Sequence, residues 1–346
     1  MNVKIIQGDC IEVMRTLDAG SVQTCVTSPP YWGLRDYGVD GQIGLESTPD
    51  AYIARMVDVF REVRRVLRDD GTLWLNLGDS YSASPAGNFG PDMSAPADGG
   101  TFRANKPKMD YRGTGLKPKD LCMIPWRVAL ALQADGWWLR SVIVWAKKSP
   151  MPESVTDRPT SSWEPIFLMA KSERYFYDAE AVKEPLTSNR PDMASKGIRT
   201  GLAYLQQGAA PSNHVMPPVG GVKHAGSNGN ATYSGNCPEW PSSRNQRNVW
   251  HLGPEPYAEA HFATFPTEIP RRCILAGSRP GDTVLDPFNG SGTTGAVAVQ
   301  HGRNYVGIEL NPAYIELAKD RIGRATNPAT YQSNKAVDAP LFGVTA

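Results

Sequence analysis

The feature that most constrains the fold is a short apolar strand that ends in an acid and runs into a glycine-rich turn. The strand is Thr283-Val-Leu-Asp286, and the turn contains Gly290, Gly292 and Gly295. After the turn, hydrophobic periodicity predicts a helix over 293–301, a strand over 304–309 and a helix over 312–322. This alternation of strands and helices predicts a doubly wound, mostly parallel sheet of the α/β class.

Two further blocks of α/β structure precede this one. The first is predicted as a strand over 23–26, a helix over 50–67 and a strand over 72–77, with Asp69-Asp70-Gly71 ending the helix. The second is predicted as a helix over 124–134 with strands over 138–145 and 166–169. A helix through 273–276 then leads into the glycine-rich block.

The glycine-rich turn predicts a cofactor site. Its glycines let a ligand approach the backbone, and the following helix presents unpaired N–H groups. Glu309 ends the next predicted strand, where an acid can accept hydrogen bonds from ribose hydroxyls. A dinucleotide is one candidate, since residues 290–295 match Gly-x-Gly-x-x-Gly, and a plain strand-to-helix turn is another. S-adenosylmethionine fits better, because Asp286 suits its sulfonium and ammonium groups and disfavours a pyrophosphate.

A second motif, Ser28-Pro29-Pro30-Tyr31, follows the first predicted strand. The two prolines have a fixed φ and no N–H, so the backbone there presents carbonyl acceptors. Ser28 adds a hydroxyl, and Tyr31 adds a flat aromatic face. Two acceptors beside an aromatic ring can hold an exocyclic amine while a flipped base stacks on the ring. The alternative is a proline-rich turn that packs an aromatic side chain.

Together the two motifs resemble those of the amino-methylating DNA methyltransferases. The Ser-Pro-Pro-Tyr motif comes before the cofactor motif, which is the order of the permuted group called the beta class. The resemblance covers residues 4–80, 117–178 and 249–323, with matching segments at 7–10, 61–71, 116–120, 151–159 and 260–266. It implies a circularly permuted S-adenosylmethionine-dependent methyltransferase fold with a loop-rich target-recognition insertion, acting on duplex DNA without a metal.

The resemblance also implies a role for each matching residue. The methionine part of the cofactor would be lined by Asp286, Phe288, Gly290 and Gly292, and the cofactor turn would be completed by Pro287, Ser291 and Thr293. Glu309 would accept from the ribose, Asp9 and Cys10 would lie at the adenine, and the far side would be closed by Thr264, Phe265 and Pro266. The target base would be held by Ser28, Pro29, Pro30 and Tyr31.

Ser28 bears on the choice of target base. In this family, Ser before Pro-Pro-Tyr is more typical of N4-cytosine enzymes, and Asp or Asn of N6-adenine enzymes. N6 of adenine stays an alternative, because a hydroxyl and a carbonyl can accept from either amine. No Pro-Cys pair is present in the sequence, which argues against C5-cytosine chemistry. Relatives more often carry His and an aromatic residue near Trp163, so this side chain is expected in the core or in the base pocket.

Charge is distributed unevenly along the chain. Its net charge is only +1, yet residues 101–119 carry +5 and residues 187–248 carry +4, so the rest carries −8. Both stretches are expected to be long loops, and basic loops are typical of a phosphate-contacting surface; solubilising charge on such loops is the alternative. The DNA-contacting candidates are Lys106, Lys108, Arg112, Lys117, Arg244, Asn245, Gln246 and Arg247.

These observations define the expected organisation. The predicted segments are a catalytic half (1–80), a flexible basic loop (81–120), a continuation of the methyltransferase domain (121–180), a target-recognition region (181–250), a cofactor-binding half (251–325) and a tail (326–346). Five scattered cysteines and no long apolar run favour a cytoplasmic protein with reduced thiols, and the resemblance implies a prokaryotic or phage source. A cognate restriction endonuclease and a homodimer are the partners considered. A non-catalytic DNA-binding protein and a dinucleotide-dependent oxidoreductase are the rival functions.

Overall fold

The computed structural model describes residues 1–82, 114–150, 152–185, 243–253, 255 and 265–326. The chain forms two units, one made of residues 1–182 and 247–346 and the other of residues 183–246. Of the second unit, the structure describes a two-stranded antiparallel pair, β6 (Glu184–Pro185) and β7 (Ser243–Arg244), in which the Arg244 Nε atom donates to Glu184 Oε2 at 3.2 Å. No helix of the described ranges is long and apolar enough to cross a membrane.

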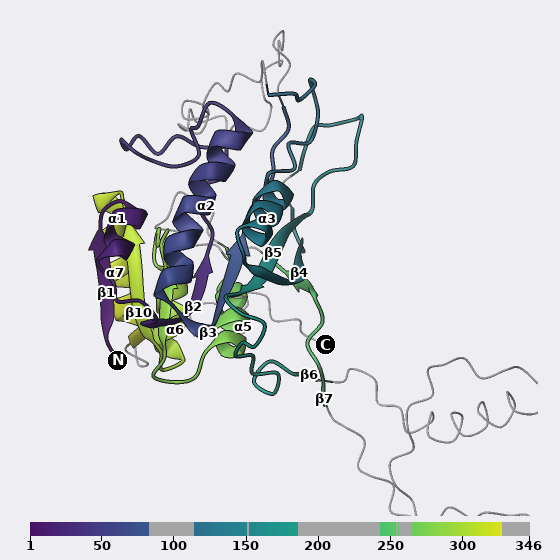
Figure 1. Ribbon diagram of the computed structural model, residues 1–346. Helices are drawn as coiled ribbons and strands as arrows, with labels where there is room; N and C mark the ends of the chain where they lie inside the picture. Colours follow the sequence, from purple (N-terminus) through teal and green to yellow (C-terminus); the bar gives the residue numbers. More distant parts are fainter. Residues whose placement is uncertain (83–113, 151, 186–242, 254, 256–264, 327–346) are drawn as a thin grey trace, which may run out of the picture. The chain divides into compact units, whose positions relative to one another are not determined.

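The first unit is built on an eight-stranded sheet in the order β1-β10-β9-β2-β3-β5-β4-β8 (Figure 1). All neighbouring strands run parallel except β5, which is antiparallel to both β3 and β4. This confirms the doubly wound, mostly parallel sheet. The strands are β1 (Val3–Gln7), β2 (Val22–Thr27), β3 (Leu67–Asn76), β4 (Trp138–Lys147), β5 (Trp163–Ala170), β8 (Val249–Leu252), β9 (Thr283–Asp286) and β10 (Asn304–Glu309).

Helices cover both faces of the sheet and enclose two apolar clusters. One cluster joins the sheet to α1 (Cys10–Arg15), α2 (Pro49–Val66) and α3 (Ile124–Ala134). The other joins it to α5 (Glu268–Gly277), α6 (Thr293–Gln300) and α7 (Pro312–Thr326). Neighbouring strand residues divide between the faces, because Leu73 packs in the first cluster and Trp74 in the second.

Helix α2 shows how the sequence specifies one of these layers. Thr48 caps it by accepting from the Ala51 N–H, and Pro49 occupies the first turn, where no N–H donor is needed. Tyr52, Met56 and Phe60 lie on the predicted apolar face and are fully buried.

Three features differ from the sequence expectations. Helix α2 ends at Val66, and Asp69-Asp70-Gly71 lie inside β3 rather than ending the helix. The reason is Leu67, which is fully buried, has extended backbone and pairs with Val22 of β2. Strands β1 and β8 and helix α1 were not predicted, because each is short and lies at the edge of a stronger pattern. The antiparallel direction of β5 was not predicted either.

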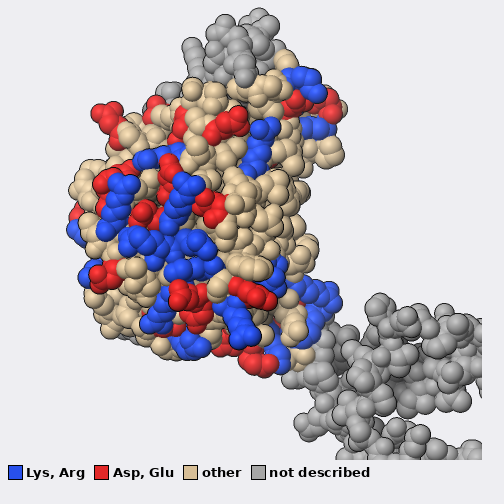
Figure 2. Space-filling model, viewed as in Figure 1, with Lys and Arg blue, Asp and Glu red and all other residues tan. Residues whose placement is uncertain are grey.

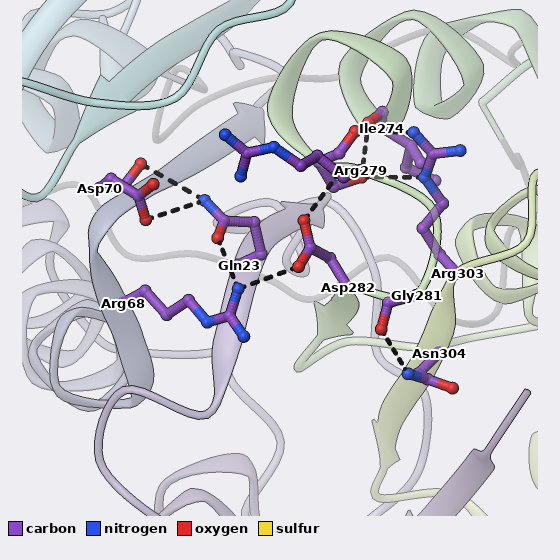
Figure 3. Close-up of polar contacts among 10 residues, drawn as sticks. Gln23, Arg68, Asp70, Ile274, Arg279, Gly281, Asp282, Arg303 and Asn304 are labelled. Atoms are coloured by element: carbon purple, nitrogen blue, oxygen red, sulfur yellow. Dashed lines mark hydrogen bonds and ion pairs between the residues drawn. The ribbon is translucent and has the colours of Figure 1, made fainter.

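The amino ends of the central strands are tied together by polar contacts (Figure 3). Arg68, at the start of β3, donates to Asp282 Oδ1 at 2.9 Å and to Gln23 Oε1 at 3.2 Å. Asp282 also accepts from the Arg279 N–H at 2.8 Å, and Asn304 donates to the Gly281 carbonyl at 2.7 Å. These contacts join loops from four strands, and they satisfy the polar groups they involve within the protein.

Candidate functional site

A cavity of about 450 Å³ lies at the opposite, carboxyl edge of the sheet. Its position follows from the topology. From β9 the chain passes through α6 to β10 on one side, whereas from β2 it passes through α2 to β3 on the other side. Ligands in open α/β sheets bind where the strand order reverses in this way. The lining includes Asp9, Cys10, Ser28, Pro29, Pro30, Tyr31, Phe265, Asp286, Pro287, Phe288, Gly290, Ser291, Thr293 and Glu309, all of them predicted site residues.

Asp286 is a buried acid at the end of β9. Its Oδ1 accepts from the Thr27 hydroxyl at 2.6 Å and from the Phe288 N–H at 3.1 Å. Burial raises the pKa of Asp286 to about 6, although the hydroxyls of Thr27 and Thr294 and the Phe288 N–H act in the other direction. None of the ion pairs among the described residues includes Asp286. An ionised Asp286 therefore needs a cation, and the cavity is where a ligand can provide one.

Glu309 ends β10 on the same edge and fixes the glycine-rich turn. Its Oε2 accepts from the Gly290 N–H at 2.7 Å, and its Oε1 accepts from the Asn311 N–H at 2.9 Å. Burial raises the pKa of Glu309. Each carboxylate oxygen can accept a second bond, so the acid can bind ligand hydroxyls while it holds the turn.

The glycines of the turn have different structural reasons. Gly290 has φ of 49° and lines the cavity. Gly292 has φ of 78° and precedes α6, and a Cβ there would lie 3.0 Å from Ala318 Cβ in α7. Gly292 is not among the cavity-lining residues, so the contact it permits is the packing of α6 against α7.

Tyr31 is held in a polar network at the other end of the cavity. Its hydroxyl donates to Glu164 Oε2 at 2.9 Å and to Asn76 Oδ1 at 3.2 Å, and the Ser28 hydroxyl donates to the Tyr31 oxygen at 3.3 Å. Burial raises the pKa of Tyr31, and the neighbouring Glu164 carboxylate adds to this. Gly78 lies against the ring, where a Cβ would come within 2.3 Å of a ring carbon. The ring and its hydroxyl are thus fixed from two sides.

The two proline carbonyls of the motif differ in their bonding. The Tyr52 hydroxyl donates to the Pro30 carbonyl at 2.9 Å. Among the described residues, no donor reaches the Pro29 carbonyl. Pro29 and Ser28 are therefore the acceptors that this motif can offer to a ligand amine.

The sequence analysis missed three polar residues at this end of the cavity, namely Asn76, Lys147 and Glu164. Lys147 ends β4, and its Nζ lies 2.5 Å from Glu164 Oε1. Glu164 lies near the amino end of β5 and reaches this edge because β5 runs antiparallel. Trp163 was expected in the core or the base pocket and is in neither: it is 46% exposed and does not line the cavity. In a strand, neighbouring side chains point to opposite faces, so Glu164 faces the cavity and Trp163 does not.

The predicted adenine-side residues have structural bonds as well. Asp9 caps α1 by accepting from the Ile11 and Glu12 N–H groups, and it pairs with Arg55 at 3.0 Å. Burial raises the pKa of the Cys10 thiol to about 12, so it stays protonated. Of the segment expected to close the far side, Phe265 lines the cavity, Pro266 is buried outside it, and Thr264 lies outside the described residues.

Few of the DNA-contacting candidates can be placed. Lys106, Lys108 and Arg112 lie outside the described residues. Lys117 is exposed, whereas Arg244 is paired with Glu184 in the second unit, which also includes Asn245 and Gln246. Arg247 begins the return to the first unit.

Basic side chains of the described residues are not gathered into one uniform patch on the face that Figure 2 shows, where Lys and Arg are interleaved with Asp and Glu. Many of them form ion pairs with acidic neighbours, as Arg61 does with Asp58 and Asp135. Such paired charges have less to offer a phosphate than free ones.

No group of His, Cys, Asp and Glu side chains among the described residues is arranged to hold a metal ion. The four cysteines that the structure describes are buried free thiols, and Cys237 lies outside the described residues.

Comparison with known proteins gives consistent matches over most of the chain. The family model described as DNA methylase, of the N6/N4 type, matches residues 22–320. The Type II methyltransferase M.Cfr9I of Citrobacter freundii is 47% identical over 324 residues, which are 93% of this chain and 89% of that protein.

Two solved structures share the fold. The PvuII DNA methyltransferase (cytosine-N4-specific) superposes with a TM-score of 0.58 at 17% identity, covering 94% of this chain and 93% of that one. A DNA modification methylase of Thermus thermophilus, solved in complex with S-adenosyl-L-methionine and titled as a putative enzyme of that class, superposes with a TM-score of 0.53 at 23% identity, covering 94% of both chains.

Proposed function

This chain belongs to the N6/N4 family of DNA methylases, and from that premise we propose that it transfers the methyl group of S-adenosylmethionine to the exocyclic N4 amine of a cytosine in duplex DNA. The observation that carries the proposal is one cavity with two chemically different ends. Asp286 and Glu309 provide carboxylates at one end, and Ser28, Pro29 and Tyr31 provide neutral acceptors and a ring at the other.

The residues at the acidic end fit S-adenosylmethionine. Asp286 is a buried acid without a cationic partner among the described residues, and the cofactor carries an ammonium and a sulfonium. Glu309 has acceptor capacity for ribose hydroxyls beyond its bonds to Gly290 and Asn311. The same features disfavour a dinucleotide, because a pyrophosphate would lie beside a buried carboxylate. The oxidoreductase alternative also leaves the Ser28 motif without a role.

The residues at the neutral end fit an extruded base. A target amine inside the duplex cannot reach a cofactor in this cavity, so the base must leave the stack. Tyr31 then offers its ring face, and Ser28 Oγ and the Pro29 carbonyl accept the two amine hydrogens. These bonds orient the nitrogen lone pair. The fixed position of Tyr31, which Gly78, Asn76 and Glu164 determine, pre-organises the site before the base arrives.

Bound S-adenosylmethionine supplies an activated methyl group on its sulfonium. The protein contributes alignment and electrostatics, because it holds the amine in line with the carbon–sulfur bond and provides acceptors where the amine becomes positive. No nucleophilic side chain is required. Cys10, the cavity cysteine, keeps its proton and does not supply one.

The test is to incubate the full chain with an unmethylated DNA library and isotopically labelled S-adenosylmethionine, and to map the modified base and its sequence context. We expect N4-methylcytosine at one short recognition sequence. N6-methyladenine would overturn the choice of base and leave the family assignment intact. Without any methylated DNA, the proposal of a non-catalytic DNA-binding protein would gain the support.

N6 of adenine is the second candidate for the same reaction. It is favoured by one observation, namely that Ser28 and the Pro29 carbonyl can accept from either amine. Target recognition is proposed for the region 181–250 with Arg244, Asn245, Gln246 and Arg247, and phosphate contacts for the basic residues Lys106, Lys108, Arg112 and Lys117. We further propose a cytoplasmic role beside a cognate restriction endonuclease, because the Citrobacter relative is a Type II methyltransferase.

A further inference from the structure

Lys147 is the one charged donor among the described residues at the base end of the cavity. That end is lined mainly by acceptors, which are Ser28 Oγ, the Pro29 carbonyl, Asn76 Oδ1 and the Glu164 carboxylate. The Asn76 amide donates to Glu164 Oε2 at 3.3 Å and to the Pro165 carbonyl at 3.1 Å, so its N–H groups are used inside the protein. Arg35, the other cation of the lining, interacts with Tyr37 and Tyr314 near Glu309 at the acidic end.

The Lys147 ammonium is held in place from two directions. Its Nζ lies 2.5 Å from Glu164 Oε1 and 5.0 Å from the centre of the Trp145 ring, and all three side chains line the cavity. An ammonium has three N–H bonds, and Glu164 takes one. Glu164 also accepts from the Tyr31 hydroxyl, so the same carboxylate orients the ammonium and the ring.

The two target bases differ in what they present beside the amine. Cytosine carries N3 and then O2, two acceptors in succession. Adenine carries N1 and then C2–H, one acceptor followed by an apolar hydrogen. A site whose acceptors hold the amine needs a donor for the rest of the edge, and a charged donor with two N–H bonds can use both acceptors of cytosine.

Building on the proposed N4-cytosine activity, we propose that Lys147 donates to the N3 and O2 edge of the flipped cytosine and gives the enzyme its preference for cytosine over adenine. Glu164 is the positioning residue that holds Lys147 and Tyr31 in register. The preference then depends on the donor at the end of β4 as well as on Ser28, which can bind either amine.

The test compares Lys147→Met with Lys148→Met, the matched control that removes the exposed neighbouring charge outside the cavity lining. Substrates are duplexes with the mapped recognition site, carrying either the native cytosine or a mismatched adenine at the target position, because a mismatch lowers the cost of flipping. Single-turnover methylation with labelled S-adenosylmethionine and excess enzyme gives both rates. Lys147→Arg tests rescue by a conservative donor.

For Lys147→Met we expect methylation of cytosine to fall about 10- to 100-fold, the range for losing a hydrogen bond to a charged group. Methylation of adenine should fall by less than about threefold, so the cytosine-to-adenine ratio shifts by the difference. S-adenosylmethionine affinity and the thermal midpoint should match those of wild type, and Lys148→Met should match wild type throughout. Lys147→Arg should recover part of the cytosine rate.

An equal fall on both bases, or no fall on cytosine, would overturn the role of Lys147 and leave the proposed N4 activity in place. Failure of the proposed function is distinguishable, because wild-type enzyme would then methylate adenine or nothing. Glu164→Gln keeps an acceptor for the Tyr31 hydroxyl but removes the charge opposite Lys147. It should therefore shift the base ratio in the same direction by a smaller factor, and an unchanged ratio would count against the positioning role.

Discussion

Two aspartates at opposite ends of β9 face opposite conditions. Asp282, at the amino end, accepts from Arg68 at 2.9 Å and from the Arg279 N–H at 2.8 Å (Figure 3). Asp286, at the carboxyl end, is buried, and its donors among the described residues are the neutral groups of Thr27, Thr294 and Phe288. The amino end is complete as folded, whereas the carboxyl end leaves a buried acid that a cationic ligand can complete. The first end contributes to stability and the second to binding.

The largest effect is expected from Ser28→Ala, which removes a neutral acceptor from the carboxyl edge. Turnover should fall by about 100- to 1,000-fold, the usual loss when one pre-organised hydrogen-bonding group is removed from an active site. The affinity for S-adenosylmethionine should persist, because Ser28 lies at the base end. Single-turnover rates and calorimetric binding measure the two. Turnover equal to wild type would remove the Ser28 motif from the mechanism.

Asp286→Asn should weaken S-adenosylmethionine binding by about 10- to 100-fold, because a charge-assisted bond becomes a neutral one. Stability should change in the opposite direction. A carboxyl whose pKa is raised to about 6 destabilises the fold once ionised, so at pH 8 the ligand-free variant should be more stable by about 1–3 kcal/mol. Chemical denaturation and calorimetry measure both. If the variant is destabilised and still binds normally, Asp286 is a structural residue like Asp282.

The pH dependence of binding sharpens the same comparison. Below a pKa of about 6, Asp286 of the ligand-free protein is protonated and neutral. The affinity for S-adenosylmethionine should therefore be flat near pH 7 and fall by up to about tenfold per pH unit below pH 6. Asp286→Asn should abolish this dependence, which calorimetric titrations between pH 5 and 7 would reveal. An identical slope in the variant would assign the dependence to another group.

The smallest effect is expected at the amino end. Asp282→Asn weakens the pair with Arg68, whose side chain is about half exposed, so the unfolding free energy should drop by about 1 kcal/mol or less. Turnover and cofactor affinity should stay at wild-type values. A loss of turnover without a loss of stability would show that the two ends of the sheet are coupled.

Local patterns in the sequence were sufficient for the parallel core. Strands β9 and β10 begin and end at the predicted residues, as does α3, because each combines an apolar run with clear boundary residues. The cavity-lining acids and the Ser28 motif were also predictable, since parallel strands place their carboxyl ends at one edge. Asp69-Asp70-Gly71 misled, because burial and pairing of Leu67 outweigh a local turn signal.

The sequence by itself thus determined the α/β class, the order of the two motifs, and the acids and acceptors at their tips. Tertiary structure alone decided which other side chains join them. Lys147 and Glu164 are 17 residues apart and meet at the cavity because β5 turns back antiparallel beside β4. Gly78 packs against the ring of Tyr31, far from it in the sequence. Strand direction and long-range packing depend on the free energy of the whole core, which no local pattern records.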